Sequence, residues 1–177
     1  MGFLSRLFGT APTRDSASAA QLAELNQRIF QARSPQDMVA AFLAKGSLLD
    51  RRMGAVDQAR EHYERALGFA PAHPVGLLLA CELAVRAGDV GQAAGLVEGA
   101  QPSAEDGSLR ASFLLARAVI ARRRGQEPTA RDLLEEARAA DPALAMALVP
   151  GADLSDLLRD RARTLGEALL EECGLHG

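Results

Sequence analysis

Residues 43–71 read LAKGSLLDRRMGAVDQAREHYERALGFAP, and the spacing of residues in this stretch returns twice further along the chain. The shared pattern is a glycine, two alanines with a larger apolar residue between them and, in two copies, a proline. The copies are Gly54, Ala59, Tyr63, Ala66 and Pro71; Gly88, Ala93, Val97 and Ala100; and Gly125, Ala130, Leu134, Ala137 and Pro142. A period of roughly 35 residues is typical of stacked helix–turn–helix units.

Each part of the pattern has a structural reason. Glycine takes the left-handed backbone conformation that ends a helix at little steric cost. Two alanines seven residues apart lie on one face of a helix and let a neighbouring helix approach closely, while the larger residue between them fills the remaining space. Proline cannot continue a helix, so it begins the turn into the next unit. The pattern therefore predicts pairs of antiparallel helices.

The pattern resembles the tetratricopeptide repeat (TPR) over about residues 40–142. The resemblance implies an all-α fold, a right-handed helical solenoid of antiparallel helix pairs, with repeats at about 40–73, 74–107 and 111–144. One departure is Arg117, which stands where the family has a small residue at a helix contact. The middle unit also lacks its terminal proline, and a few extra residues follow it.

The flanking segments complete a single domain over residues 19–177. Residues 19–33 form an amphipathic pattern that predicts a helix closing the first end of the solenoid. Residues 34–37, with serine before proline and aspartate, predict the start of the next helix. After a short helix, residues 153–173 predict a long helix, with Asp153 or Ser155 as its cap, that closes the second end.

The N-terminal residues form a separate element. Residues 1–9 read MGFLSRLFG and predict a short amphipathic segment whose apolar face is Phe3, Leu4, Leu7 and Phe8. So short a helix needs a surface to fold against, and three surfaces are open to it: its own solenoid, a membrane interface or another protein. Residues 10–18 contain small polar residues and proline, which predicts a flexible linker.

In TPR proteins the first helices of the units line a concave groove that holds a partner segment. The resemblance places in that groove Ala41, Ala44, Leu48, Arg51 and Arg52 from the first unit, Val75, Leu78, Glu82, Val85 and Arg86 from the second, and Ser112, Leu115, Val119, Arg122 and Arg123 from the third. Together they form an apolar floor with arginines along one rim. Such a groove suits an amphipathic helix or an apolar segment whose acidic residues meet the arginines.

The leading hypothesis is a non-enzymatic adaptor or chaperone that binds a partner peptide or helix in the concave groove. A narrower version, implied by the resemblance, is a bacterial secretion chaperone of three TPR units. Two alternatives are a membrane-associated assembly factor tethered by residues 1–9 and a self-assembling scaffold. A further alternative is that the N-terminal segment or the C-terminal helix covers the apolar groove residues and that the arginines are only solvated.

The composition of the chain argues against several classes of function. The net charge of −3 argues against general nucleic-acid binding, which normally needs a basic field. The three histidines, His62, His73 and His176, have no metal-ligand spacing with cysteine or aspartate, and no catalytic constellation or phosphate-binding loop is present. We therefore expect no enzyme activity, no metal and no cofactor. We also expect a cytoplasmic protein, peripheral to the inner face of the membrane if residues 1–9 bind lipid.

Overall fold

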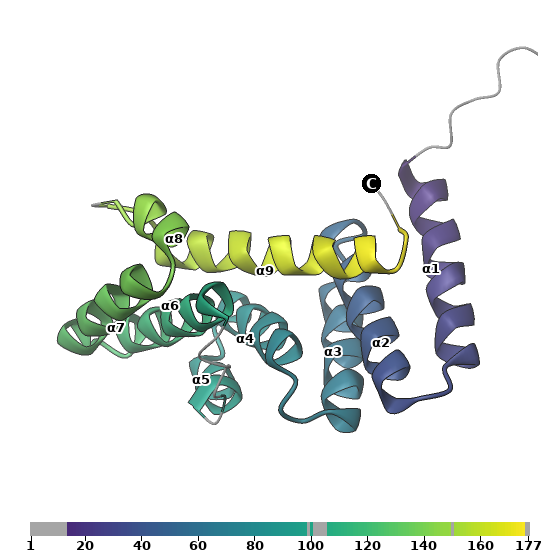
Figure 1. Cartoon of the computed structure of the whole chain (residues 1–177), viewed down its shortest axis with the longest axis horizontal. Coiled ribbons are helices and arrows are strands. Elements are labelled where there is room, and N and C mark those ends of the chain that lie inside the picture. The colour runs from purple at the N-terminus through teal and green to yellow at the C-terminus, as the bar shows by residue number, and fades with distance from the viewer. Residues whose placement is uncertain (1–13, 99, 101–105, 150, 176–177) are drawn as a thin grey trace, which may run out of the picture.

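The fold is all-α, as the sequence predicts. The computed structural model describes residues 14–98, 100, 106–149 and 151–175, and every regular element within them is a helix (Figure 1). The helices are α1 (Arg14–Gln31), α2 (Pro35–Arg51), α3 (Val56–Phe69), α4 (Pro74–Ala87), α5 (Val90–Glu98), α6 (Gly107–Arg123), α7 (Glu127–Ala140), α8 (Pro142–Ala147) and α9 (Leu154–Glu172).

Three helix pairs carry the repeated sequence pattern. Helix α2 packs against α3, α4 against α5, and α6 against α7. The first alanine of each copy, Ala59, Ala93 and Ala130, has no exposed surface, so these small residues face neighbouring side chains as predicted. The larger residue of the first copy, Tyr63, is also fully buried.

The turns within the pairs follow the prediction for glycine. Gly54, Gly88 and Gly125 have φ angles of 67°, 80° and 74°, in the left-handed region that L-residues with a side chain rarely adopt. Gly88 caps α4 directly, and its N–H donates to carbonyls of the last turn. The glycines therefore set the end of the first helix in each pair.

The predicted helix starts are also observed. Ser34 and Asp37 form a reciprocal capping box at the start of α2, with Pro35 in the first turn. At the start of α9, Asp153 accepts hydrogen bonds from the N–H groups of Ser155 and Asp156. Aspartate, rather than Ser155, is thus the cap of this long helix.

Arg117, the departure from the repeat pattern, has a structural role. It lies on α6, and its guanidinium donates to the carbonyl oxygens of Val97, at 2.9 Å, and Ala100, at 3.1 Å. These carbonyls belong to the end of α5 and the residues just after it, where the middle unit lacks its proline. A cation at a helix C-terminus complements both the free carbonyls and the helix dipole.

The N-terminal boundary differs from the prediction. The segment expected as a linker, residues 10–18, is helical from Arg14 onward, and α1 extends to Gln31 rather than to residue 33. Ser18 lies within this helix and is 5 % exposed. Small polar residues and alanines resemble a linker in composition, but alanine is also the strongest helix former. Residues 10–13 lie outside the described part of the chain.

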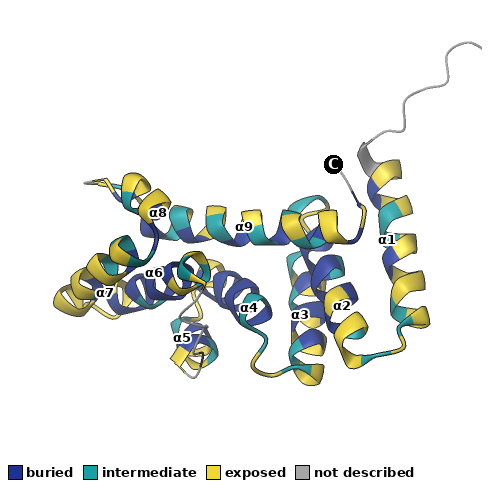
Figure 2. Cartoon of the chain, in the orientation of Figure 1, coloured by how far each residue is buried: buried dark blue, intermediate teal, exposed yellow. Residues whose placement is uncertain are grey.

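The long C-terminal helix lies elsewhere than expected. Instead of closing the end of the repeat stack, α9 contacts α2, α4 and α6, the first helices of all three pairs. Figure 1 shows α9 running lengthwise across these helices, from α8 towards α1. In Figure 2 the buried residues of α2, α4 and α9 face one another. We call the surface of α2, α4 and α6 on the side of α9, including the part at the start of α2 that α9 leaves uncovered, the inner face.

Candidate partner-binding face

Most of the apolar groove residues predicted from sequence are buried in clusters that also contain residues of α9. Leu48, Leu78 and Leu115 have no exposed surface, and Val85 and Val119 are almost fully buried. Of the others, Ala41, Ala44 and Ser112 are buried as well, whereas Val75 is half-buried in the first turn of α4. The structure therefore brings the predicted floor together, and the helix that occupies it belongs to the same chain.

The face of α9 that fills the groove is a stripe with one residue per turn. Leu154 and Leu158 join the apolar cluster of α4 and α6, Ala162 joins that of α2 and α4, and Leu170 packs with Leu48 of α2. Between Ala162 and Leu170 the stripe has Gly166, which lies against Ser47. Leu157, Leu165 and Leu169 of α9 are only partly buried and pack against the same clusters.

The arginines of the first two units are paired rather than merely solvated. Arg52 donates to Gln21 at 2.8 Å and to Glu167 of α9 at 3.1 Å. Arg86 donates to Asp50 at 2.5 Å. Arg51 Nη2 lies 3.6 Å from Glu82 Oε2. These contacts tie α1, α2, α4 and α9 to one another.

A charged cluster is buried beneath α9. It consists of Asp50 and Arg51 from α2 and Glu82 and Arg86 from α4, and the side chains of Asp50 and Glu82 are only 0 % and 3 % exposed. Arg51 Nε lies 3.1 Å from Asp50 Oδ2, but the orientation is not that of a hydrogen bond, so neither atom has a hydrogen-bond partner. Glu82 Oε2 has none either. Sequence reasoning missed Asp50, which stands between two leucines and two arginines and looks like an ordinary surface charge.

The pKa of Glu82 is raised above its ordinary value. Burial is the largest influence and disfavours the carboxylate, while Arg86 and Arg51 oppose it without reversing the shift. Arg159 of α9 approaches the same carboxylate, with its Nε atom 3.8 Å from Glu82 Oε1. Removing α9 would rehydrate Glu82 and take away one of its cationic neighbours.

The arginines of the third unit lie at the other end of α9. Arg123 donates to the carbonyl oxygen of Val85 at 2.8 Å and to the hydroxyl of Ser155 at 3.4 Å. Arg122 is exposed and lies 3.6 Å from Glu127. Arg123 thus joins α4, α6 and the first turn of α9, whereas Arg122 lines an open cavity of about 410 Å³ beside the first turn of α9.

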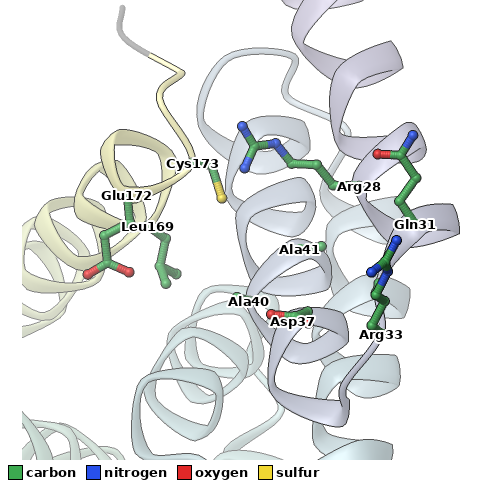
Figure 3. Close-up of a pocket in the computed structure, with 10 residues that line it drawn as sticks. Arg28, Gln31, Arg33, Asp37, Ala40, Ala41, Leu169, Glu172 and Cys173 are labelled. Carbon is green, nitrogen blue, oxygen red and sulfur yellow. The ribbon is translucent and has the colours of Figure 1, made fainter.

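The inner face stays open beyond the last turn of α9. Two adjoining cavities of about 420 Å³ and about 220 Å³ lie there, over the start of α2, and share Ala40, Leu169 and Glu172. The larger reaches α1 at Arg28, and the smaller reaches the exposed ring of Phe69. Figure 3 shows Leu169 and Glu172 of α9, with Cys173 just after them, on one side of the start of α2, and Arg28 and Gln31 of α1 on the other side. We call these two cavities the end cleft.

Some predictions have no counterpart in the described part of the chain. Phe3, Leu4, Leu7 and Phe8 lie outside it. In the residues that the structure describes, no helix is both long and apolar enough to cross a membrane, and no group of three or more histidine, cysteine, aspartate or glutamate side chains has a geometry that could hold a metal ion.

A comparison of the chain with protein-family models, curated proteins and solved structures finds no match.

Proposed function

We propose that this chain is a non-enzymatic, TPR-like adaptor that binds an amphipathic helix of a partner protein on its inner face. The observation that carries this proposal is the fit of α9 itself: three successive first helices, α2, α4 and α6, accept a 19-residue helix along its whole length. Binding of an amphipathic helix in an apolar groove is a recurring mode of protein recognition.

The chemistry of the inner face supports a helical ligand over a small molecule. Its floor is leucine, alanine and valine from separate helices, and its polar contacts to α9 are spread along that helix, at Arg52, Glu82, Ser108 and Arg123. Apolar anchors spaced along a groove, with charges at separate points, specify a long ligand and its register. The charges have both signs, so the ligand carries both as well.

The experiment is site-specific photo-crosslinking in the cell of origin. A photoreactive residue replaces Ala40, an exposed residue that lines both cavities of the end cleft. We expect crosslinks to a partner segment in which apolar residues recur with helical spacing. Since Phe30 of α1 is 91 % exposed and lines neither cavity, the same photoreactive residue at position 30 is the matched control.

The outcomes separate this function from others. Crosslinks from position 40 but not from position 30, with a helical pattern in the crosslinked segment, support a partner on the inner face. Equal crosslinking from both positions, or none, contradicts it. Crosslinks to a second copy of this chain would support a self-assembling scaffold instead.

A further inference from the structure

The contacts of α9 are those of a helical ligand in a groove. The residues Leu154, Leu158, Ala162, Gly166 and Leu170 recur every fourth position and meet the floor, and four of them have 6 % or less of their surface exposed while Gly166 is buried. Two charged residues flank this stripe about two turns apart. Arg159 reaches Glu82, and Glu167 reaches Arg52.

The floor beneath α9 is poorly suited to permanent burial. Asp50 and Glu82 each keep an oxygen without a hydrogen bond although both side chains are almost fully buried. Burying charged groups costs free energy that an apolar floor of the same shape would not cost, and buried ion pairs are weak contributors to stability. These charges cost less free energy in a face that is exposed to water for part of the time, because water then solvates them.

Helix α9 can leave without undoing the helix pairs. It inserts between none of the pairs α2–α3, α4–α5 and α6–α7, which pack directly against each other. It is joined to α8 by residues 148–153, which include Gly151 in the left-handed conformation, with a φ of 87°. The end cleft adds an uncovered apolar surface beside the last turn of α9, where a competing helix can first make contact.

We propose that α9 is an exchangeable occupant of the inner face and that the partner segment is an amphipathic helix that replaces it. This inference rests on the proposed function and adds the chemistry of the partner. The partner helix has a small residue or leucine at every fourth position, a basic residue opposite Glu82 and, about two turns further on, an acidic residue opposite Arg52. The docked α9 and the bound partner exclude each other, so α9 lowers the apparent affinity for the partner.

The test uses the full chain and a fluorescent synthetic peptide of residues 153–173 that carries Cys173→Ser. Binding is measured by fluorescence anisotropy to the wild-type chain and to a Gly166→Leu chain. A leucine at position 166 crowds α2, because its Cβ atom alone would lie 3.1 Å from Ser47 Oγ and its larger side chain has to displace Ser47 or α9. We expect the Gly166→Leu chain to bind the peptide about tenfold more tightly or better, since its own α9 no longer occupies the inner face.

A second variant tests the same proposal in case the Gly166→Leu chain does not fold. In the Glu167→Arg chain the ion pair with Arg52 is lost, but Glu167 is 39 % exposed, so the fold tolerates the change. This chain should also bind the peptide more tightly than the wild type does. A peptide carrying Arg159→Glu, which places a carboxylate opposite Glu82, should bind the Gly166→Leu chain about tenfold more weakly than the unmodified peptide. Equal peptide binding by the wild type and both folded variants would overturn the proposal.

Amide hydrogen exchange of the wild-type chain tests independently whether α9 leaves the inner face. An exchangeable α9 opens without global unfolding, so its amides should exchange faster than those in the centre of α4. Equal protection of α9 and α4 counts against exchange even if the crosslinks at position 40 appear, and the partner would then use the end cleft alone. Conversely, α9 can open and the inner face can bind the peptide while position 40 gives no crosslinks. That result supports the exchange of α9 and contradicts the proposed adaptor function.

Discussion

Gly166 of α9 packs directly on Ser47 of α2. A Cβ atom at position 166 would lie 3.1 Å from Ser47 Oγ and 3.3 Å from Ser47 Cβ, closer than ordinary van der Waals contact. Ser47 is held in place from its other side, because its hydroxyl lies 3.3 Å from the hydroxyl of Tyr63 and shares a hydrogen bond with it. A side chain at position 166 is therefore accommodated only if Ser47 or α9 shifts.

The first prediction concerns this contact. An exposed Gly→Ala change in a helix interior normally stabilises by about 1 kcal/mol. At position 166 we expect Gly166→Ala to lower the free energy of unfolding instead, because Ser47 cannot move away without losing its bond to Tyr63. In a Ser47→Gly background the same change should become stabilising, with a coupling of about 1–2 kcal/mol between the two sites. Urea unfolding of the four proteins of this cycle gives the coupling, and additive effects would contradict the contact.

The second prediction compares two helical glycines. A Cβ atom at Gly46 would lie 2.6 Å from Tyr63 Cδ1, whereas a Cβ atom at Gly95 would have no atom within 4 Å. We expect Gly46→Ala to destabilise by about 3 kcal/mol, since the Tyr63 ring is fully buried and cannot shift freely. Gly95→Ala should stabilise by about 1 kcal/mol through helix propensity alone. Thermal unfolding of both variants measures the contrast, which disappears if α2 and α3 do not pack this closely.

The third prediction concerns the arginine at the end of α5. Arg117→Ala removes the donors to the carbonyl oxygens of Val97 and Ala100. Hydrogen bonds from charged donors are worth about 1.5–3 kcal/mol, so we expect a loss of about 2 kcal/mol in the free energy of unfolding. Arg117→Lys should restore only part of it, because a single ammonium lacks the planar fork of donors. A neutral effect of Arg117→Ala would mean that α5 needs no such cap.

The fourth prediction is a pH dependence at His62. Its ring stacks on Phe42 with 5.8 Å between ring centroids, and its pKa is lowered from 6.5 to about 4, first by burial and then by Lys45 and Arg65. Because the unfolded chain takes up a proton at higher pH than the folded chain, stability falls as the pH drops from 6.5 towards 4. His62→Leu should remove this part of the loss. Denaturant unfolding at pH 7 and pH 5 compares the two proteins, and equal losses would contradict a neutral, buried His62.

The sequence predicts the helix pairs well because their determinants are local. Left-handed glycines such as Gly88 and small contacts such as Ala93 recur with the repeat, and each leaves a mark at a fixed position in the sequence. The capping residues of α2 and α9 are local as well. The boundary of α1 was wrong because a run of alanines and serines suits both a linker and a helix.

No local sequence feature predicts where α9 packs. An amphipathic stripe predicts that one face of a helix is buried, but it does not say which helices bury it. The small residues Ala162 and Gly166 matter only because α2 and α4 approach them, and those helices are far away in the sequence. Likewise Asp50 and Arg159 look like surface charges until the fold places them near Glu82. The positions of the groove residues were thus predictable, whereas the sequence left the occupant of the groove open between a partner segment, the N-terminal segment and the C-terminal helix, and the structure shows the last of these.

The last prediction concerns Glu82 and the charged cluster. Burial raises the pKa of Glu82 although Arg86, Arg51 and Arg159 surround it. The folded chain therefore holds this proton to higher pH than the unfolded chain, whose glutamates ionise near 4.5. The contribution of Glu82 is fully present below pH 4.5 and is lost as the pH rises through the raised pKa. Glu82→Gln should consequently be most destabilising at pH 4 and progressively less so towards pH 8.

The pKa of Asp141 is shifted in the opposite direction from that of Glu82. Burial alone would raise the pKa of Asp141, but hydrogen bonds from the Ala143 N–H and from Arg161 of α9, at 2.6 Å, outweigh burial and lower it. The stabilisation from Asp141 is therefore lost as the pH falls, and Asp141→Asn should be more destabilising at pH 7 than at pH 3. Urea unfolding of both variants at several pH values should show opposite trends: the loss of stability caused by Glu82→Gln falls as the pH rises, and the loss caused by Asp141→Asn grows. If the cost of Glu82→Gln instead grows with pH, as for Asp141→Asn, the cluster beneath α9 is an ordinary stabilising ion pair, and the argument that its charges favour an exchangeable α9 fails.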